Sequence, residues 1–286
     1  MVKGGVIISL PSAGSMNGDS LGQTGSDVSS GRSAVSGTIL FVTHSEWREA
    51  RVAPMLEGWG YAIERCCPAQ GDSLPQDSRS YAGAIVFGGA QSANDAPTTP
   101  YMQQEIDWIG DYVAGGGRYL GICLGGQLLA RAFGARVARH PEGLNEIGYY
   151  PLRPTAAGQA FFPDPLHVYH WHQEGFELPE RAELLAAGDA FPNQAFRLGP
   201  RAFGLQFHPE VRPADARSWF EVAADHLIRP GAQTREQQEA GFMRHDPLLT
   251  AWLDRFLARW LERDVIRPTT ARACAVGCEA SVAPGL

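Results

Sequence analysis

The stretch Gly121-Ile122-Cys123-Leu124-Gly125-Gly126-Gln127 joins an apolar run to a helix-forming one. Residues 118–122 predict a short buried strand, and residues 127–133 predict a helix that ends at Gly134. Cys123 therefore lies at a strand-to-helix turn, where neighbouring glycines permit backbone conformations that a Cβ would block. This arrangement is typical of a nucleophile elbow, in which the N-terminus of the helix stabilises a thiolate.

A lone cysteine in an apolar context is more often a buried structural residue than a nucleophile. Two other segments favour the chemical role. Residues 204–210, Gly-Leu-Gln-Phe-His-Pro-Glu, place His208 and Glu210 after another apolar strand. Residues 87–90, Phe-Gly-Gly-Ala, end a further strand where backbone N–H groups can face a substrate. A thiol, a base, a carboxylate that orients the base and an oxyanion site are the groups that acyl transfer needs.

The order of apolar and amphipathic segments predicts an α/β fold with a mostly parallel central sheet flanked by helices. The main expected strands are residues 38–43, 61–67, 82–87, 118–122 and 202–207, and the main expected helices are 45–58, capped by Ser45, and 101–114 and 214–228. Residues 136–140 and 147–152 are expected in a small antiparallel layer, and residues 153–166 in a loop over the site. Because ligands bind at the carboxyl ends of parallel strands, Gly88, Gly89 and Cys123 are expected at one edge of the sheet.

The composition divides the chain into three regions. Residues 1–37 contain 8 glycines and 9 serines, which predicts a flexible extension with too little apolar surface to fold. Residues 38–228 are expected to form the main domain, and residues 229–286 a helical appendage with a loose tail. Within the appendage, residues 246–263 carry an apolar stripe at helical spacing. We expect this helix to pack on the domain, and a partner-binding helix is the alternative.

Charge and cysteine content exclude several classes of protein. The net charge of -7 argues against a surface for nucleic acid or an acidic membrane. No apolar run reaches the ~18 residues that a membrane span needs. The chain has five cysteines without a regular framework, which predicts reduced thiols and a cytoplasmic location. The pair Cys274 and Cys278 lacks the further ligands that a zinc site requires.

With these motifs in order, the chain resembles the class I glutamine amidotransferases of the Cys-His-Glu triad type, nearest their free-standing GMP-synthase-like domains. The matching pieces are Phe87-Gly88-Gly89, the elbow at Cys123, Glu146-Ile147-Gly148, Trp171-His172 and Gln206-Phe207-His208-Pro209-Glu210. They span about residues 38–228. The resemblance implies a flavodoxin-like fold, no cofactor, and catalysis by Cys123, His208 and Glu210.

The resemblance also implies further site residues. It places oxyanion-hole N–H groups at Gly89 and Leu124, and contacts to the substrate at Gly88, Gln127 and His172. At the position where members of the family commonly carry Gly-Asp after this histidine, the chain has Gln173-Glu174.

A metal site is not expected, because three converging ligands are needed and only two converge. His170 and His172 share one face of a strand, whereas His167 faces the other way. Cys66 and Cys67 are expected to be packing residues, and Glu105 has no assigned role.

Three functions remain open on this basis. The first is a glutaminase that passes ammonia to a separate synthetase partner, since no ATP-binding glycine loop follows residue 228. The second is a stand-alone hydrolase of a γ-glutamyl amide that uses the same thioester chemistry. The third is a non-catalytic binding or regulatory protein, against which the intact Cys123, His208 and Glu210 argue.

Overall fold

The computed structural model describes residues 37–45, 51–76 and 80–263. The predicted extension up to residue 36, the helix start between residues 46 and 50, and the tail from residue 264 with its two cysteines lie outside the described residues.

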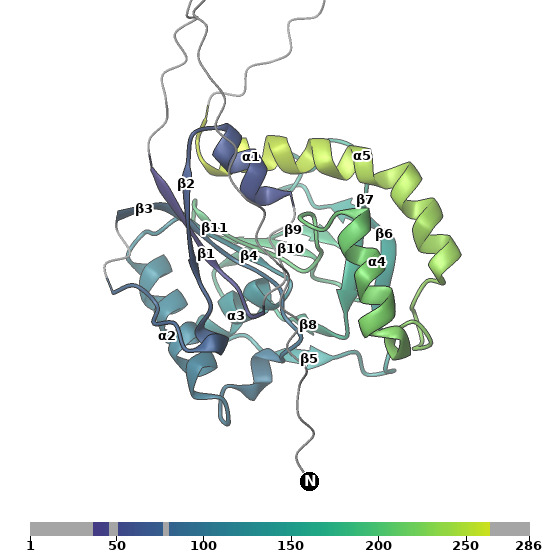
Figure 1. The fold of residues 1–286 in the computed structure, drawn as a ribbon, viewed down its shortest axis with the longest axis horizontal. Coiled ribbons are helices and arrows are strands. Elements are labelled where there is room, and N and C mark those ends of the chain that lie inside the picture. The colour runs from purple at the N-terminus through teal and green to yellow at the C-terminus, as the bar shows by residue number, and fades with distance from the viewer. Residues whose placement is uncertain (1–36, 46–50, 77–79, 264–286) are drawn as a thin grey trace, which may run out of the picture. The chain divides into compact units, whose positions relative to one another are not determined.

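A nine-stranded sheet organises the fold, and five neighbouring strands in it run parallel (Figure 1). These strands are β2 (Ala62–Cys66), β1 (Thr38–Val42), β3 (Tyr81–Val86), β4 (Tyr119–Ile122) and β11 (Ala202–Leu205), in spatial order. The inner strands β1, β4 and β11 are short and almost fully apolar, as expected for strands buried on both faces, whereas β2 lies at the edge of the sheet and is mostly exposed. The expected α/β fold with a mostly parallel sheet is confirmed.

The sheet continues beyond β11 with four antiparallel strands. They are β10 (Ala195–Leu198), β9 (Ala182–Ala187), β6 (Glu146–Pro154) and β7 (Leu166–His172). A separate two-stranded sheet pairs β5 (Val137–Arg139) with β8 (Glu174–Phe176). The small antiparallel layer therefore consists of β5 and β8. The placement of residues 147–152 in that layer is wrong, because β6 pairs with both β9 and β7 and so extends the main sheet.

Helices cover both faces of the sheet. The helices α2 (Pro100–Ala114) and α3 (Leu124–Ala132) share one apolar cluster, and α1 (Val52–Gly58), α4 (Pro213–Val222) and α5 (Arg235–Trp260) share another. Within the described residues, short 3-10 segments are η1 (Pro68–Gln70), η3 (Ala93–Asp95) and η4 (Ala224–His226). Strand β1 shows the division, since Leu40 and Val42 belong to the first cluster and Ile39 and Phe41 to the second.

Helix α5 begins eleven residues before the expected start at residue 246. Thr234 accepts a hydrogen bond from the backbone of Gln237, and the Gln237 side chain accepts one from the backbone of Thr234. The expected start was wrong because residues 235–245 are mostly polar and lack the apolar stripe that marks the rest of the helix. The far end of α5 packs on β3, where a Cβ on Gly83 would lie 2.8 Å from the Trp260 ring. In the part of the chain that the structure describes, no helix has the length and apolarity that crossing a membrane requires.

The segment between β6 and β7 lies under α5 and does not cover the site. Phe162 is buried in this segment and stacks on Trp252 of α5, with ring centroids 5.2 Å apart. No residue of this segment lines the pocket described below. The expected loop over the site is therefore wrong, because its aromatic side chains are taken up by the core.

Candidate active site

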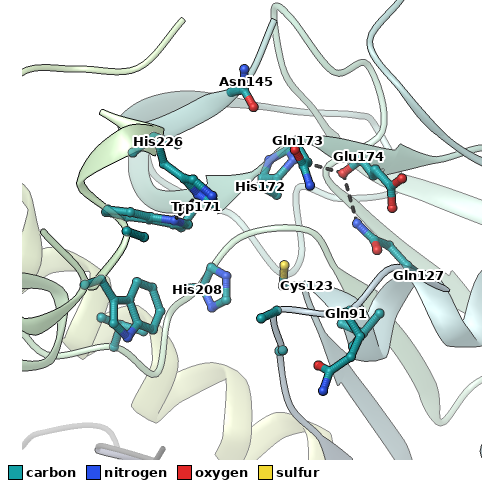
Figure 2. Close-up of a pocket in the computed structure, with 18 of the residues that line it drawn as sticks. Gln91, Cys123, Gln127, Asn145, Trp171, His172, Gln173, Glu174, His208 and His226 are labelled. Atoms are coloured by element: carbon teal, nitrogen blue, oxygen red, sulfur yellow. Dashed lines mark hydrogen bonds between the residues drawn. The ribbon is translucent and has the colours of Figure 1, made fainter. Parts of the chain in front are cut away.

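Four parallel strands deliver side chains or backbone to one pocket at their carboxyl ends. His44 follows β1, Gly88 follows β3, Cys123 follows β4 and His208 follows β11, and all four line a pocket of about 780 Å³. Figure 2 shows the His208 ring beside the Cys123 sulfur in this pocket. The sheet therefore brings together residues that lie far apart in the sequence, at the edge where ligands bind in such folds.

Cys123 occupies a strained turn between β4 and α3. Its backbone has φ 51° and ψ -106°, a region that non-glycine residues rarely adopt. The turn is held by the Cys123 N–H, which donates to the Leu205 carbonyl at 2.7 Å. It also needs Gly125, since a Cβ there would lie 2.1 Å from the Val86 carbonyl oxygen. Helix α3 begins at Leu124, so its first N–H groups have no partner within the helix and lie next to the thiol.

His208 and Glu210 form a short buried pair across Pro209. The His208 Nδ1 atom lies 2.7 Å from Glu210 Oε1, and both side chains are almost fully buried. Burial alone lowers the His208 pKa, but the interactions with Glu210 and with the Cys123 side chain outweigh it and raise the pKa to about 10. The Glu210 carboxylate thus favours the protonated form of the imidazole.

Gly88 brings the backbone of the turn after β3 against the side chains of both Cys123 and His208. A Cβ at Gly88 would lie 2.8 Å from His208 Cε1 and 3.5 Å from Cys123 Cβ. Only a residue without a side chain leaves room for the thiol and the imidazole to meet here. The structure thus brings Cys123, His208, Glu210 and Gly88 together.

A second buried histidine–glutamate pair, which the sequence did not reveal, lies behind the Gly88-Gly89 turn. His44 Nε2 lies 3.0 and 3.1 Å from the two carboxylate oxygens of Glu105 on α2. The His44 Nδ1 atom donates to the Gly88 carbonyl at 3.3 Å. Both side chains are 0% exposed. Burial lowers the His44 pKa, but the charge and hydrogen bond of Glu105 raise it overall.

The contacts of His44 fix the orientation of one peptide group. The C=O and N–H of a trans peptide point in opposite directions, so holding the Gly88 carbonyl turns the Gly89 N–H away from His44. The turn packs tightly on the ring, since a Cβ at Gly89 would lie 2.8 Å from His44 Cβ.

The other predicted contact residues belong to a chain of amide hydrogen bonds beside the thiol. Gln127 Nε2 donates to the Glu174 carbonyl at 2.9 Å and to Gln206 Oε1 at 3.3 Å. The Gln206 amide donates in turn to the Cys123 sulfur at 3.8 Å. His172 lines the pocket, but its Nδ1 atom is engaged by the Glu174 carbonyl at 3.0 Å. Gln127 and His172 thus line the pocket, but Gln127 Nε2 and His172 Nδ1 already form hydrogen bonds within the protein.

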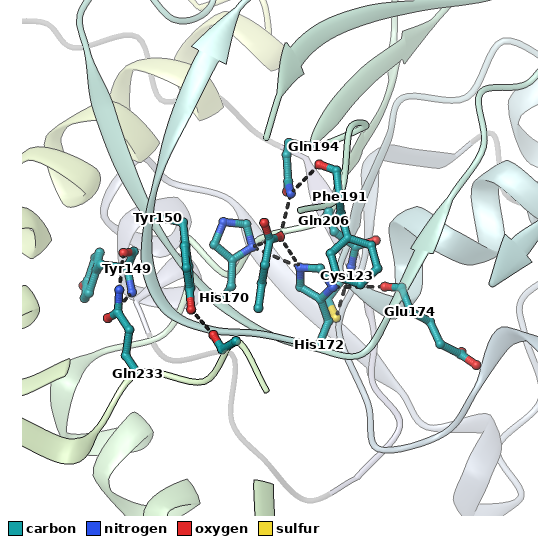
Figure 3. Close-up of polar contacts among 12 residues, drawn as sticks. Cys123, Tyr149, Tyr150, His170, His172, Glu174, Phe191, Gln194, Gln206 and Gln233 are labelled. Carbon is teal, nitrogen blue, oxygen red and sulfur yellow. Dashed lines mark hydrogen bonds and ion pairs between the residues drawn. The ribbon is translucent and has the colours of Figure 1, made fainter. Parts of the chain in front are cut away.

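A third group of titratable side chains adjoins the pocket through His172, and Figure 3 shows His170 and His172 close together in it. The Glu146 carboxylate lies next to His170 and His172, and Gln194 donates to it at 2.7 Å. Burial raises the Glu146 pKa, but the two imidazoles and the hydrogen bonds lower it to about 2. Burial lowers the His170 pKa to about 3. The expectation that only two ligand-type groups converge here is wrong, because Glu146 is a third.

The outer pocket carries charges of both signs. Glu174 and Asp225 supply carboxylates, and Arg139 and Arg229 supply guanidinium groups. Arg229 donates to Asp225 at 2.8 Å and to the Gln173 side chain at 3.0 Å. Such a lining complements a ligand that carries both an ammonium and a carboxylate group.

A family model described as glutamine amidotransferase class-I matches residues 67–222. The glutamine amidotransferase-like protein YfeJ of Salmonella typhimurium is 34% identical over 225 residues, which cover 75% of this chain and 90% of that protein. A crystal structure of a glutamine amidotransferase from Methylobacillus flagellatus superimposes with a TM-score of 0.73 at 27% identity, covering 79% of this chain and 94% of that one.

Two other relatives match shorter parts. A glutamine-hydrolyzing GMP synthase of Aeropyrum pernix is 30% identical over 181 residues, which cover 60% of this chain and 33% of that protein. The gamma-glutamyl peptidase 4 of Arabidopsis thaliana is 30% identical over 144 residues, which cover 47% of this chain and 56% of that protein.

Proposed function

This chain belongs to the class I glutamine amidotransferase family, and from that premise we propose that it hydrolyses a γ-glutamyl amide through a thioester on Cys123. The substrate is glutamine itself or a γ-glutamyl derivative of another amine. One observation carries the proposal: Cys123, in a strained turn at the start of α3, shares a buried pocket with the His208–Glu210 pair. A structural cysteine would need neither the strained turn nor the charged pair.

In the first half of the reaction, the Cys123 thiolate attacks the side-chain carbonyl carbon and forms a carbon–sulfur bond. The protonated His208 then gives its proton to the leaving nitrogen, and the carbon–nitrogen bond breaks to release ammonia or an amine. Glu210 holds the ring through Nδ1 and stabilises the imidazolium, so the proton is delivered from the other nitrogen.

The oxyanion formed in this step needs hydrogen-bond donors that are already in place. We assign this role to the backbone N–H groups of Gly89 and Leu124, each worth about 3 kcal/mol in comparable sites. His44 and Glu105 act as positioning residues. Glu105 holds the His44 ring, and the hydrogen bond from His44 to the Gly88 carbonyl sets the direction of the Gly89 N–H. The pair has no need to touch the substrate.

In the second half, water attacks the thioester while His208 takes its proton. The carbon–sulfur bond breaks, glutamate leaves, and the Cys123 thiolate is restored. A thiol nucleophile must stay unoxidised, which is why we keep the cytoplasm as the expected location.

The pocket suits the amino-acid end that all these substrates share. Arg139 and Arg229 provide cations for the α-carboxylate, and Glu174 and Asp225 provide carboxylates for the α-ammonium group. Gly88, Gln127 and His172 line the pocket around the amide. We also propose that the catalytic unit extends from β1 through α5, since α5 belongs to the same apolar cluster as β1 and β11.

Two functions of this site remain as alternatives. The match to a glutamine-hydrolyzing GMP synthase supports a glutaminase that passes ammonia to a separate synthetase partner. The pocket volume of about 780 Å³ favours the other, a stand-alone hydrolase of γ-glutamyl amides. Ligand pockets commonly measure about 300–1,000 Å³, and free glutamine needs only the small end of that range.

The test compares glutamine with a panel of γ-glutamyl amines, following glutamate release by the pure protein and by a Cys123→Ala control. Turnover of a γ-glutamyl amine with poor turnover of glutamine selects the stand-alone hydrolase. Turnover of glutamine only after a synthetase-like protein is added selects the coupled glutaminase. If no substrate is hydrolysed and none forms a thioester, the protein is a non-catalytic member of the fold and the proposal is wrong.

A further inference from the structure

Three side chains with metal-binding atoms converge on the same side of the β6–β7 pair. Glu146 lies directly opposite His172 in the antiparallel register, and His170 lies two residues before His172 on the same strand. Alternate residues of a strand share a face, so the two imidazoles and the carboxylate meet. All three side chains are buried, with exposed fractions of 1% to 2%.

The separations match the edges of a metal coordination sphere. Glu146 Oε2 lies 3.0 Å from His172 Nε2 and 3.5 Å from His170 Nδ1, and the two nitrogens lie 3.1 Å apart. A tetrahedral ion with bonds of about 2.0–2.1 Å places its ligand atoms about 3.3 Å from one another. The three atoms therefore already stand where the ligands of one small ion would stand.

The hydrogen bonds around the cluster turn its remaining nitrogen and oxygen atoms toward one another. His172 donates its Nδ1 proton to the Glu174 carbonyl at 3.0 Å, so its Nε2 lone pair is directed at the carboxylate and at His170. His170 Nδ1, 3.1 Å from His172 Nε2, either donates a proton within the cluster or leaves three acceptor atoms, which repel one another unless a metal ion lies among them.

The outer contacts resemble those that support metal ligands. A metal-binding imidazole commonly donates its second N–H to a carbonyl, and His172 donates to the Glu174 carbonyl in this way. A metal-binding carboxylate commonly accepts a further hydrogen bond, and Glu146 accepts one from Gln194. The Gln194 Oε1 atom, at the other end of that amide, is buried without a hydrogen-bond partner among the described residues. A water bound to the ion is a donor of the kind that this atom lacks.

We propose that Glu146, His170 and His172 bind one divalent transition-metal ion, with zinc as the first candidate. Two imidazoles and one carboxylate are a ligand set that zinc accepts, and the fourth position is left for water. His172 lines the large pocket, which gives the ion a path to the cluster. The ion cross-links β6 and β7 in the pocket wall, and the proposal is independent of the thioester chemistry.

The experiment measures metal binding by tag-free protein in a Cys123→Ala background, which removes the pocket thiol as a competing ligand. Metal is stripped with a chelator, and zinc and cobalt(II) are then titrated by equilibrium dialysis and visible absorption. Glu146→Gln and His170→Gln remove one ligand each. His167→Gln is the matched control, because His167 lies on β7 and stacks on His245, the other place where imidazoles gather.

We expect one equivalent of zinc and of cobalt(II), with visible cobalt bands that lack sulfur-to-metal charge transfer. The affinity should fall by about 100-fold or more in Glu146→Gln and His170→Gln and stay unchanged in His167→Gln. Zinc should raise the melting temperature of the parent and of His167→Gln, but not of the two ligand variants, whose folding is checked by circular dichroism.

Two results would overturn the proposal. If the parent binds neither ion more tightly than the ligand variants do, a proton occupies the centre of the cluster. If His167→Gln loses the binding, the ion belongs to the His167–His245 stack and not to this site.

Discussion

Two histidine–glutamate pairs flank the Gly88-Gly89 turn, and they differ in what the imidazole faces. In the His208–Glu210 pair the partners lie two residues apart, and the ring lies beside the Cys123 sulfur. In the His44–Glu105 pair the partners lie 61 residues apart, and the second ring nitrogen bonds the Gly88 carbonyl. The residue types, the burial and the direction of the histidine pKa shift are the same.

The comparison teaches that residue type and burial do not by themselves define a catalytic base. We propose that an imidazole held by a carboxylate acts as a proton donor where a thiol and a substrate can reach it. The same unit becomes a support where it meets a backbone carbonyl. We therefore expect substitutions in the first pair to affect the chemical step strongly and those in the second to affect it moderately.

The largest effect is expected for His208→Gln. Without an imidazole the leaving nitrogen receives no proton and water is not activated, so kcat should fall by about 10⁴-fold or more. The matched control His167→Gln replaces a histidine outside the pocket and should keep normal turnover. Substantial turnover by His208→Gln would show that the two pairs do not differ as we describe.

The next effect concerns the charge of Glu210. Because the His208 pKa is raised to about 10, activity should persist at neutral pH and fall as the pH rises through that value. Glu210→Gln removes the largest raising charge, so the alkaline limit should move to lower pH and kcat should fall by about 10²–10³-fold. The measurement is a pH profile of kcat for both proteins, and an unmoved alkaline limit would contradict the assignment.

The raised His208 pKa also predicts how stability depends on pH. A group with a raised pKa stabilises the folded state fully below its ordinary value of 6.5, and that contribution is lost as the pH rises through about 10. Chemical denaturation at several pH values should therefore show a loss of stability across this range that is smaller in Glu210→Gln.

The smallest effect is expected in the second pair. Glu105→Gln keeps an acceptor for His44 but removes the charge, so the Gly88 carbonyl is held less firmly and kcat should fall about tenfold with little change in KM. The control Asp107→Asn changes an exposed acid on the same helix. If kcat of Glu105→Gln falls as much as kcat of Glu210→Gln, His44 takes part in the chemical step and the proposed difference between the two pairs is wrong.

The first pair could be predicted from the sequence because its residues lie in one short motif. His208 and Glu210 follow a buried strand, and Cys123 has its own local pattern of glycines. The second pair joins β1 to α2 across the sheet, which no local pattern reveals. One signal was present, since Glu105 occupies the same helical stripe as the buried Met102, Ile106 and Ile109. A carboxylate on a buried stripe requires a partner.

Other differences have similarly local causes. The long helix α5 looked shorter in the sequence because its first half, residues 235–245, is mostly polar. Glu146 could not be joined to His170 and His172, because the register of β6 on β7 is set through the connection between them. The main strand and helix segments followed from apolar periodicity, whereas the convergence of side chains depended on register and packing.

The central claim is most directly tested by labelling with a glutamine analogue that carries an electrophilic ketone. Intact-mass and peptide analysis should find one adduct, on Cys123, in the wild-type protein. None should form in Cys123→Ala, and formation should be strongly slowed in His208→Gln. Cys66 and Cys67, the other buried thiols in the described part of the chain, should remain unmodified. Labelling that is absent, or that survives in Cys123→Ala, would contradict the account.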